Sequence, residues 1–450
     1  MSDLVWGDTV SRDAFEHGLR LGPGRAVLWL RAHPSSDFRD LILHACTHNL
    51  AYDRQWEGSR EDYLFDLVQA SGEPDWYYDQ LTSIVTGPRD EEVSYDQILE
   101  MMRLWAQHGH PTARQTLYAG FLAAIDADDS SGDEAIIELD GADGLTFVAD
   151  HLGRLKRVPD EYRYDRFIID AAKEAGVADP LAVLNAAIEQ HPAIAQFLER
   201  VAAFEAHDRP AQLRPRDTKV RDYAKLRAWL DEVETNQRSL GFKVWGRNAT
   251  DSDLLLAAAD LVTETNDKRR RALLNVFWER AYPLDPAPLI ALVAHADPLI
   301  SAPAMHRLEN IPASEAVRSA ALVWLAGNDE RAARAVGILE HQFHPGDHAL
   351  VEALASRVTD NNAWHLFNVR TRVFYEAHPD AASEPRILLT LYEHNPCVMC
   401  RESIVRRLLK LNALPDWLAA ECRADAGPEI RKMLKEYDNP PVPIEVAPNA

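Results

Sequence analysis

Residues 94–109, SYDQILEMMRLWAQHG, carry the pattern that decides the fold. Four large apolar side chains recur there at intervals of three, four and three residues, at Tyr95, Ile98, Met102 and Trp105. This spacing places all four on one face of an α-helix. Ser94 and Gln97 have the spacing of a capping box at the helix start, and Gly109 is a typical residue at a helix end. The stretch therefore predicts a helix with one buried face.

The same helical spacing continues outside this stretch, for example at Leu350, Leu354 and Val358. Apolar residues make up 46% of the 450 residues, while glycine, at 20, is scarce. This balance is typical of a chain that is mostly helical. No stretch alternates apolar and polar residues with β-branched enrichment, so we expect no sheet. The predicted fold class is all-α.

Proline marks the ends of the predicted helices. Asp precedes Pro at three positions where Asp can cap a helix and Pro can occupy its first turn, namely Asp179, Asp285 and Asp297. His precedes Pro at five further breaks between apolar stripes, namely His33, His110, His191, His344 and His378. Helices of about 10–15 residues joined by loops of about 2–5 residues pack antiparallel to their neighbours. The expected unit is therefore a helical hairpin, stacked along the chain.

Two segments share a capped start, an apolar stripe and a proline stop. The first begins with HADPL at residues 295–299 and reaches Pro312, and the second begins with HNPCV at residues 394–398 and reaches Pro415. A turn with Asp or Asn before Pro, followed by a helix of small and branched residues, resembles the second helix of a HEAT repeat. The resemblance covers about residues 250–438, and more loosely the part before them. It implies an α-solenoid of stacked antiparallel hairpins; HEAT-like proteins are mostly protein-binding scaffolds, with a minority of enzymes.

Composition divides the chain into four segments. Residues 1–206 are expected to form an N-terminal array of helical hairpins and residues 218–437 a C-terminal HEAT-like array. Between them, HDRPAQLRPRD at residues 207–217 combines two prolines with three arginines, which is typical of a linker, although a long loop inside one array has the same composition. Residues 438–450 hold four prolines and no apolar stripe, so an extended tail is predicted.

The formal net charge of −23 repels nucleic-acid phosphates and anionic membranes. No stretch approaches the roughly 20 consecutive apolar residues that span a bilayer, and residues 1–10 lack the features of a secretory or transit peptide. Four cysteines in 450 residues give no disulfide framework, as is typical of a reducing compartment. We expect a cytoplasmic protein that binds neither nucleic acid nor membrane.

Aromatic and charged residues are concentrated in the connection YDRQWEGSREDY at residues 52–63. Aromatic side chains beside arginine on a loop are typical of interaction hot spots. A second irregular segment, residues 236–250, holds two more large aromatic residues. The candidate partner-binding residues are Tyr52, Trp56, Arg60, Phe242 and Trp245. The alternative for Tyr52 and Trp56 is packing beneath the loop as a small satellite core.

One nitrogen and three sulfurs that suit a tetrahedral zinc ion lie close in the sequence, at His394, Cys397, Cys400 and Cys422. A helical pattern competes with this interpretation, because Cys397 and Cys400 continue the apolar stripe of Ile404 and Leu408. Two residues three apart on a helix can both bind zinc only if the helix start unwinds around them. We therefore interpret the cysteines as core residues and predict neither a metal site nor a cofactor.

Other motifs give weaker signals. Residues 126–138, DADDSSGDEAIIE, approach a calcium-loop pattern, but neither register fits it, so a solvated acidic loop is expected. The basic run KRRR at residues 268–271 is interpreted as the solvent face of a helix start rather than a phosphate contact. The sequence holds no nucleotide-binding or hydrolase motif and no His-Glu dipeptide of the kind that iron-binding HEAT-like hydroxylases use.

Two functions of different classes fit these observations. The first is a non-enzymatic scaffold or adaptor that presents a solenoid surface to a protein partner, whose identity no spacing rule supplies. The alternative is a HEAT-like enzyme or a ligand- or nucleic-acid-binding protein, such as a glycosylase-type DNA reader. A basic groove would favour the alternative, whereas exposed aromatic residues among mixed charges would favour the scaffold.

Overall fold

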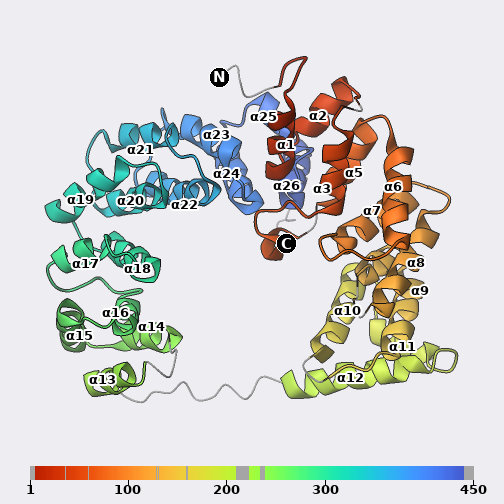
Figure 1. Ribbon diagram of the computed structural model, residues 1–450, viewed down its shortest axis with the longest axis horizontal. Coiled ribbons are helices and arrows are strands. Elements are labelled where there is room, and N and C mark those ends of the chain that lie inside the picture. Colours follow the sequence, from red (N-terminus) through yellow and green to blue (C-terminus); the bar gives the residue numbers. More distant parts are fainter. Residues whose placement is uncertain are drawn as a thin grey trace, which may run out of the picture. The chain divides into compact units, whose positions relative to one another are not determined.

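The computed structural model describes residues 6–35, 37–58, 60–127, 129, 131–158, 161–208, 222–233 and 239–439. Across these residues the chain forms 26 helices and no strand, so the all-α prediction is confirmed (Figure 1). In the same residues, no helix combines the length and the apolar character needed to cross a bilayer.

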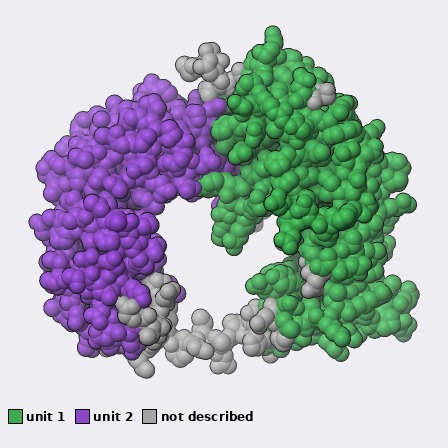
Figure 2. All heavy atoms as spheres, viewed as in Figure 1, with its two compact units in different colours: residues 1–216, 415–450 green, residues 217–414 purple. Residues whose placement is uncertain are grey.

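Contacts within the chain divide it into two compact units, which Figure 2 colours separately. Unit 1 consists of Met1–Arg216 and Pro415–Ala450, and unit 2 consists of Asp217–Leu414. The last helices thus group with the first ones, whereas the sequence pattern placed them in the C-terminal array. From position 209 onward the predicted linker lies outside the described residues, and so does the predicted tail beyond position 439.

Unit 1 holds the helices of the first half of the chain and the last two. Their bounds are α1 (Arg12–Leu21), α2 (Arg25–Ala32), α3 (Arg39–Thr47), α4 (Arg54–Glu57), α5 (Glu61–Ala70), α6 (Pro74–Thr86), α7 (Tyr95–Gln107), α8 (Ala113–Asp126), α9 (Asp133–Gly153), α10 (Tyr162–Glu174), α11 (Pro180–Ala187), α12 (Ala193–Asp208), α25 (Asp416–Cys422) and α26 (Pro428–Asp438). Helices α3, α5, α7 and α9 contact one another in succession, and α6 contacts α8 beside them. A continuous core of buried apolar side chains runs along these helices.

Helix α7 corresponds to the helix predicted from residues 94–109. Its four predicted face residues are all buried. Gly109 follows the helix with a φ of +83°. The N–H of His110 donates to the carbonyl of Trp105 at 2.9 Å, which closes the helix as a Schellman motif. The predicted end of this helix is therefore confirmed.

The predicted capping box at the start of α7 is wrong. Ser94 occupies the N-cap position, but its side chain accepts no capping hydrogen bond. The Gln97 amide is buried and donates to the carbonyls of Ala45 and Cys46, both at 2.9 Å. These carbonyls belong to the last turn of α3, where no intrahelical donor remains for them. Gln97 therefore joins two helices instead of capping its own.

The C-terminal helices pack on the first helices of unit 1 (Figure 1). Arg25 of α2 pairs with Glu421 of α25 at 2.9 Å, and both side chains are buried. The N–H of Ala426 donates to the carbonyl of Gly22 at 2.8 Å. A Cβ atom on Gly24 would lie 2.1 Å from the carbonyl oxygen of Glu421, so only glycine fits at this crossing. The two ends of the chain thus share one core.

Unit 2 holds α13 (Tyr223–Asp231), α14 (Ser239–Asn248), α15 (Asp251–Thr263), α16 (Asp267–Val276), α17 (Ala287–Leu292), α18 (Pro298–Glu309), α19 (Glu315–Leu325), α20 (Glu330–His341), α21 (Asp347–Ala355), α22 (Asn361–Ala377), α23 (Glu384–His394) and α24 (Val398–Lys410). The even-numbered helices from α14 to α24 contact one another in succession. The odd-numbered pairs α13 and α15, α17 and α19, and α21 and α23 do the same. Two rows of helices therefore run side by side through this unit (Figure 1).

The three predicted Asp-Pro helix starts are confirmed. Each Asp side chain accepts a hydrogen bond from a backbone N–H two or three residues later, at 2.8–2.9 Å, in α11, α17 and α18. The following proline is the first helical residue of α11 and α18, whereas Pro286 is the N-cap residue of α17. Because proline has no N–H to leave unsatisfied there, the dipeptide sets the first turn of these helices.

Candidate functional site

The first predicted binding segment has an exposed and a buried part. Trp56 on α4 is 70% exposed, and Tyr52 is half-buried. Arg60 is only 4% exposed. Its guanidinium donates to the carbonyl of Arg20 at 2.9 Å and pairs with Glu57 at 3.1 Å. Arg60 therefore satisfies the end of α1 and is not presented to a partner.

The second predicted binding segment lies in the core of unit 2. Phe242 and Trp245 on α14 are 1% and 0% exposed. The indole N–H of Trp245 donates to the carbonyl of Asp222 at 3.1 Å. A Cβ atom on Gly246 would lie 1.7 Å from the carbonyl oxygen of Val276, so the glycine serves close packing of α14 on α16. This packing accounts for Gly246, and Phe242 and Trp245 are buried rather than exposed to a partner.

A groove with a volume of about 410 Å³ lies among α7, α9, α10 and the connection that contains α4. Four carboxylates line it, those of Asp96, Glu100, Asp133 and Glu134. Tyr164 and Phe167 of α10 also line it and are 44% and 53% exposed. The remaining lining residues are Asn49, Arg54, Gly58, Ser94, Gly132, Leu152, Arg157 and Ile168. We call this feature of unit 1 the acidic groove.

Two local features place the carboxylates in the acidic groove. Asp96 and Glu100 are four residues apart on α7, so they share one helix face. Gly132 precedes α9 with a φ of +90°, a conformation that favours glycine, and it is followed directly by Asp133 and Glu134 in the first turn. The start of one helix therefore faces the side of another, with carboxylates on both.

The carboxyl group of Glu100 titrates near neutral pH. Burial raises its pKa to about 7, although the Arg103 guanidinium, at 2.6 Å, lowers it. The carboxylates of Glu138 on α9 and Glu61 on α5 raise it further. Desolvation therefore outweighs the one cation that contacts this group.

The carboxyl group of Asp133 behaves in the same way. Burial raises its pKa to about 8, against the backbone N–H of Glu134, which donates to it at 2.7 Å. The charges of Glu134 and Asp96 raise it further, and Arg157 lowers it. Arg157 is itself paired with Asp165 at 3.2 Å. Burial also raises the pKa values of Asp96 and Glu134.

These properties favour a cationic guest in the acidic groove. Buried carboxyl groups without enough positive charge around them hold protons, and an incoming cation can replace those protons. Phe167 adds an aromatic face on which a guanidinium or ammonium group can lie, and the ring of Tyr164 already has the Arg163 guanidinium 5.0 Å from its centroid. The groove therefore combines the two features that recognise arginine or lysine side chains.

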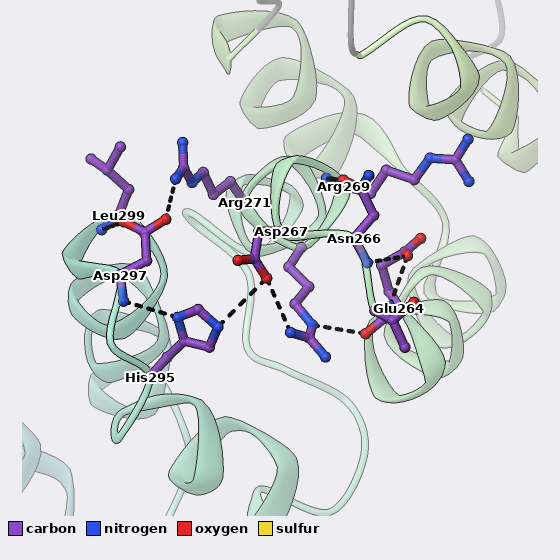
Figure 3. Close-up of polar contacts among 10 residues, drawn as sticks. Glu264, Asn266, Asp267, Arg269, Arg271, His295, Asp297 and Leu299 are labelled. Carbon is purple, nitrogen blue, oxygen red and sulfur yellow. Dashed lines mark hydrogen bonds and ion pairs between the residues drawn. The ribbon is translucent and has the colours of Figure 1, made fainter.

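The basic run at residues 268–271 is neutralised inside unit 2. Three of its arginines pair with acidic residues, namely Arg269 with Asp231, Arg270 with Asp267 and Arg271 with Asp297. Figure 3 shows the carboxylate of Asp267, at the start of this helix, beside the ring of His295; a ring nitrogen lies 3.5 Å from the carboxylate. Asn266 caps the helix by accepting the N–H of Arg269 at 3.1 Å. The predicted helix start is confirmed, and its arginines join neighbouring helices.

The acidic segment at residues 126–138 is described except for positions 128 and 130. Asp129 accepts the hydroxyl proton of Ser131 at 2.7 Å and pairs with Arg89. Asp133 begins α9 and lines the acidic groove. The described carboxylates of this segment thus have separate roles, and none of them is part of a metal-ligand cluster among the described residues.

The described residues contain one cluster of metal-ligand side chains, formed by His365, Cys397 and Cys400. Their ligand atoms lie within 4.8 Å of one another, and Sγ of Cys400 is 3.5 Å from Nδ1 of His365. Cys397 is the N-cap residue of α24 and has an extended backbone, while Cys400 lies in the first turn. The helix thus starts after the first cysteine, which is the geometry that binding by both cysteines requires.

Both cysteines are also buried, at 5% and 6% exposed, as expected for core residues. A hydrogen bond from the Cys400 thiol lowers the pKa of Cys397 to about 4, and His365 lowers it as well. The cluster therefore favours a thiolate at the start of α24.

The other two candidate ligands lie elsewhere. The ring of His394 stacks on Trp364, with the ring centroids 4.6 Å apart, and Cys422 belongs to α25 of unit 1. The histidine of the cluster, His365, precedes Cys400 by 35 residues and lies on a different helix. No local spacing signals it, because the packing of α22 on α24 brings it to the cysteines.

No family model, curated protein or solved structure matches this chain. The acidic groove and the cysteine–histidine cluster are the two features of the structure that bear on function.

Proposed function

We propose that this chain is a HEAT-like α-solenoid that binds a protein partner and that its acidic groove receives a cationic segment of that partner. Support for the solenoid comes from unit 2, where the even-numbered helices from α14 to α24 contact one another in succession and three pairs of odd-numbered helices pack in the same way. The succession of α3, α5, α7 and α9 in unit 1 supports it as well. Stacked hairpins of this kind bury a continuous core and leave surfaces for binding.

The observation that carries the binding proposal is that four carboxylates and two exposed aromatic rings line one groove, with Glu100 and Asp133 partly buried in it. An arginine or lysine side chain can displace the protons on Glu100 and Asp133 and form charge-assisted hydrogen bonds. Its aliphatic stem can lie against Tyr164 and Phe167. A volume of about 410 Å³ accommodates a few side chains of a peptide.

The neighbouring connection enlarges this surface. Arg54 lines the groove, and Trp56 on the same short helix exposes 70% of its surface. Exposed tryptophan beside a groove is typical of interface hot spots. We therefore still expect Trp56 to contribute to partner binding.

A DNA reader is the weaker alternative, because it requires a basic groove. The groove of unit 1 is acidic, and the described arginines of the basic run in unit 2 are paired with carboxylates. An enzyme is favoured by one observation, the carboxyl group of Glu100 with a pKa of about 7, which suits a general acid. A bound peptide that is recovered uncleaved supports binding over catalysis.

Fluorescence anisotropy with a labelled peptide tests the proposal. The probe contains arginine, lysine and tyrosine, and the matched peptide carries glutamate in place of each basic residue. We expect the full chain to bind only the basic peptide, and more weakly as salt is added, because the contacts are ionic. The double variant Glu100→Gln/Asp133→Asn should weaken binding by about tenfold or more, since it removes both groups that exchange a proton for the guest.

A control variant with two carboxyl-to-amide changes outside the groove distinguishes binding in the groove from electrostatic attraction to the acidic chain as a whole. Glu189 and Glu199 are exposed residues of unit 1 that do not line the groove. The double variant Glu189→Gln/Glu199→Gln makes the same kind of carboxyl-to-amide change. It lowers the negative charge of the chain at least as much, because Glu100 and Asp133 are partly protonated at pH 7, and it should bind like the unmodified chain. Equal losses in both double variants would show that the −23 charge as a whole attracts the peptide, and the proposed site would be abandoned.

A further inference from the structure

We propose that His365, Cys397 and Cys400 form a binding site for one Zn²⁺ ion in unit 2. A tetrahedral zinc ion with Zn–S of about 2.3 Å and Zn–N of about 2.05 Å places its sulfur and nitrogen ligands about 3.5 Å apart. The distance between Sγ of Cys400 and Nδ1 of His365 is 3.5 Å. All three ligand atoms lie within 4.8 Å of one another, so small side-chain rotations bring the third to the same ion.

The fold holds the two sulfurs in place through the start of α24. The backbone N–H of Cys397 donates to Oδ1 of Asn395 at 2.9 Å, which turns the chain just before the helix. Cys397 is then extended, and Cys400 follows in the first helical turn. The backbone N–H of Cys400 also donates to the Cys397 sulfur. Backbone donors of this kind stabilise a negatively charged sulfur in a site that excludes most of the solvent.

Helix α22 supplies the nitrogen ligand and a buried polar side chain near it. It contacts α24, and His365 on it is half-buried, which leaves one side of the cluster accessible. Asn368, one turn later on the same helix face, is fully buried, and neither atom of its amide has a hydrogen-bond partner in the described structure. Nδ2 of Asn395 also lacks one. Buried amides are normally satisfied, so these polar groups are unusual beside the cysteine–histidine cluster.

The ligand set points to zinc among the common cations. Thiolate and imidazole ligands suit Zn²⁺, whereas Mg²⁺ and Ca²⁺ require oxygen ligands. Three protein ligands leave the fourth position for water or for an exogenous ligand, as in zinc sites that are not purely structural. This site lies in unit 2 and does not depend on the acidic groove in unit 1.

Metal content and cobalt spectroscopy of the full chain test the site. Protein purified with a reductant from zinc-supplemented cells should contain about one zinc ion per chain. After removal of the metal by a chelator, Co²⁺ alone should restore a tetrahedral visible spectrum with sulfur-to-cobalt charge-transfer absorption. Zn²⁺ alone should displace the cobalt and raise the Tm. Absence of metal and of the charge-transfer absorption would overturn the proposal, as would a Cys397–Cys400 disulfide in the reduced preparation.

Substitutions identify the ligands. Cys397→Ser, Cys400→Ser and His365→Ala should each abolish stoichiometric zinc. The matched controls Cys46→Ser, Cys422→Ser and His394→Ala change the same residue types outside the cluster and should retain it. Zinc that persists in the first three variants, or that is lost from the Cys422→Ser variant, contradicts this ligand set.

A measurement on the unmodified chain covers the case in which a variant does not fold. Titration of its thiols with a mercurial reagent should release zinc, measured with a chromogenic chelator, as the cluster cysteines react. Zinc that stays bound after all four thiols have reacted would show that sulfur does not hold it.

Discussion

At the scale of single residues, Glu100 makes the stability of unit 1 depend on pH. The pKa of this carboxyl group is about 7 in the folded chain, against 4.5 for the unperturbed group. Between these two values the folded state binds more protons than the unfolded state, so stability falls as pH rises. Asp133, with a pKa raised to about 8, acts in the same direction over a wider range.

We therefore expect the free energy of unfolding to decrease between pH 5 and pH 8. The variant Glu100→Gln resembles the protonated form at every pH, so it should reduce this decrease by on the order of 1 kcal/mol. Urea denaturation of both proteins across the range measures the effect. The exposed-site variant Glu189→Gln should leave the decrease unchanged, and a stability that increases with pH in the unmodified chain would show that the assigned pKa shift has the wrong sign.

Arg60 and Trp56 were predicted from one segment as binding residues, yet they should behave in opposite ways. Arg60→Ala removes a buried guanidinium that pairs with Glu57 and donates to the carbonyl of Arg20, and it should lower stability by about 3 kcal/mol. Trp56→Ala removes an exposed ring and should change stability by less than about 0.5 kcal/mol. Thermal denaturation compares the two variants. If Arg60→Ala leaves the Tm unchanged, the structural role assigned to this residue is mistaken.

The composition of residues 52–63 indicates a binding region, but it does not indicate which of its side chains are exposed to a partner. The sequence places Trp56 and Arg60 four positions apart in a connection, and nothing local distinguishes a side chain that faces solvent from one that reaches the end of α1. The same limit applies to the zinc cluster. Cys397 and Cys400 are adjacent in the sequence pattern, whereas His365 becomes their neighbour only through the packing of α22 on α24.

At the scale of helices, short sequence patterns predict those helix starts and ends that depend only on neighbouring residues. The Asp-Pro starts and the glycine end of α7 depend on residues within a few positions, and the structure confirms them. The Gln97 side chain was predicted to cap α7 but donates to carbonyls 51 and 52 residues away in sequence. A spacing rule cannot detect such a partner, because the donor that α3 needs comes from a neighbouring helix.

The crossing at Gly24 is the tightest point between the first and last helices of unit 1. A methyl group there would overlap the carbonyl oxygen of Glu421, so Gly24→Ala should lower stability by about 1–3 kcal/mol and loosen α25 and α26. Thermal denaturation and limited proteolysis near residue 415 measure both effects. Gly7→Ala is the control, because a Cβ atom at that position meets nothing within 4 Å. Equal Tm values for the two variants would contradict this packing.

At the scale of the whole molecule, composition and periodicity predicted an all-helical chain, and the described residues confirm it. The packing of α25 and α26 on α1 and α2 was not predictable, since it joins residues about 400 positions apart through a buried ion pair and a glycine contact. The net charge of −23 predicts electrostatic repulsion of polyanions, but it does not indicate where the acidic groove lies. The groove depends on which carboxylates the helices bring together and desolvate.

Calorimetric titration of the full chain with the basic peptide, at pH 7 in two buffers of different ionisation enthalpy, tests the central claim most directly. At pH 7 Glu100 is partly and Asp133 mostly protonated, so binding of a cationic segment should release protons from them. We expect binding with net proton release that disappears in the Glu100→Gln/Asp133→Asn variant and persists in the Glu189→Gln/Glu199→Gln variant. Absence of binding, or binding whose heat is the same in both buffers, would contradict it.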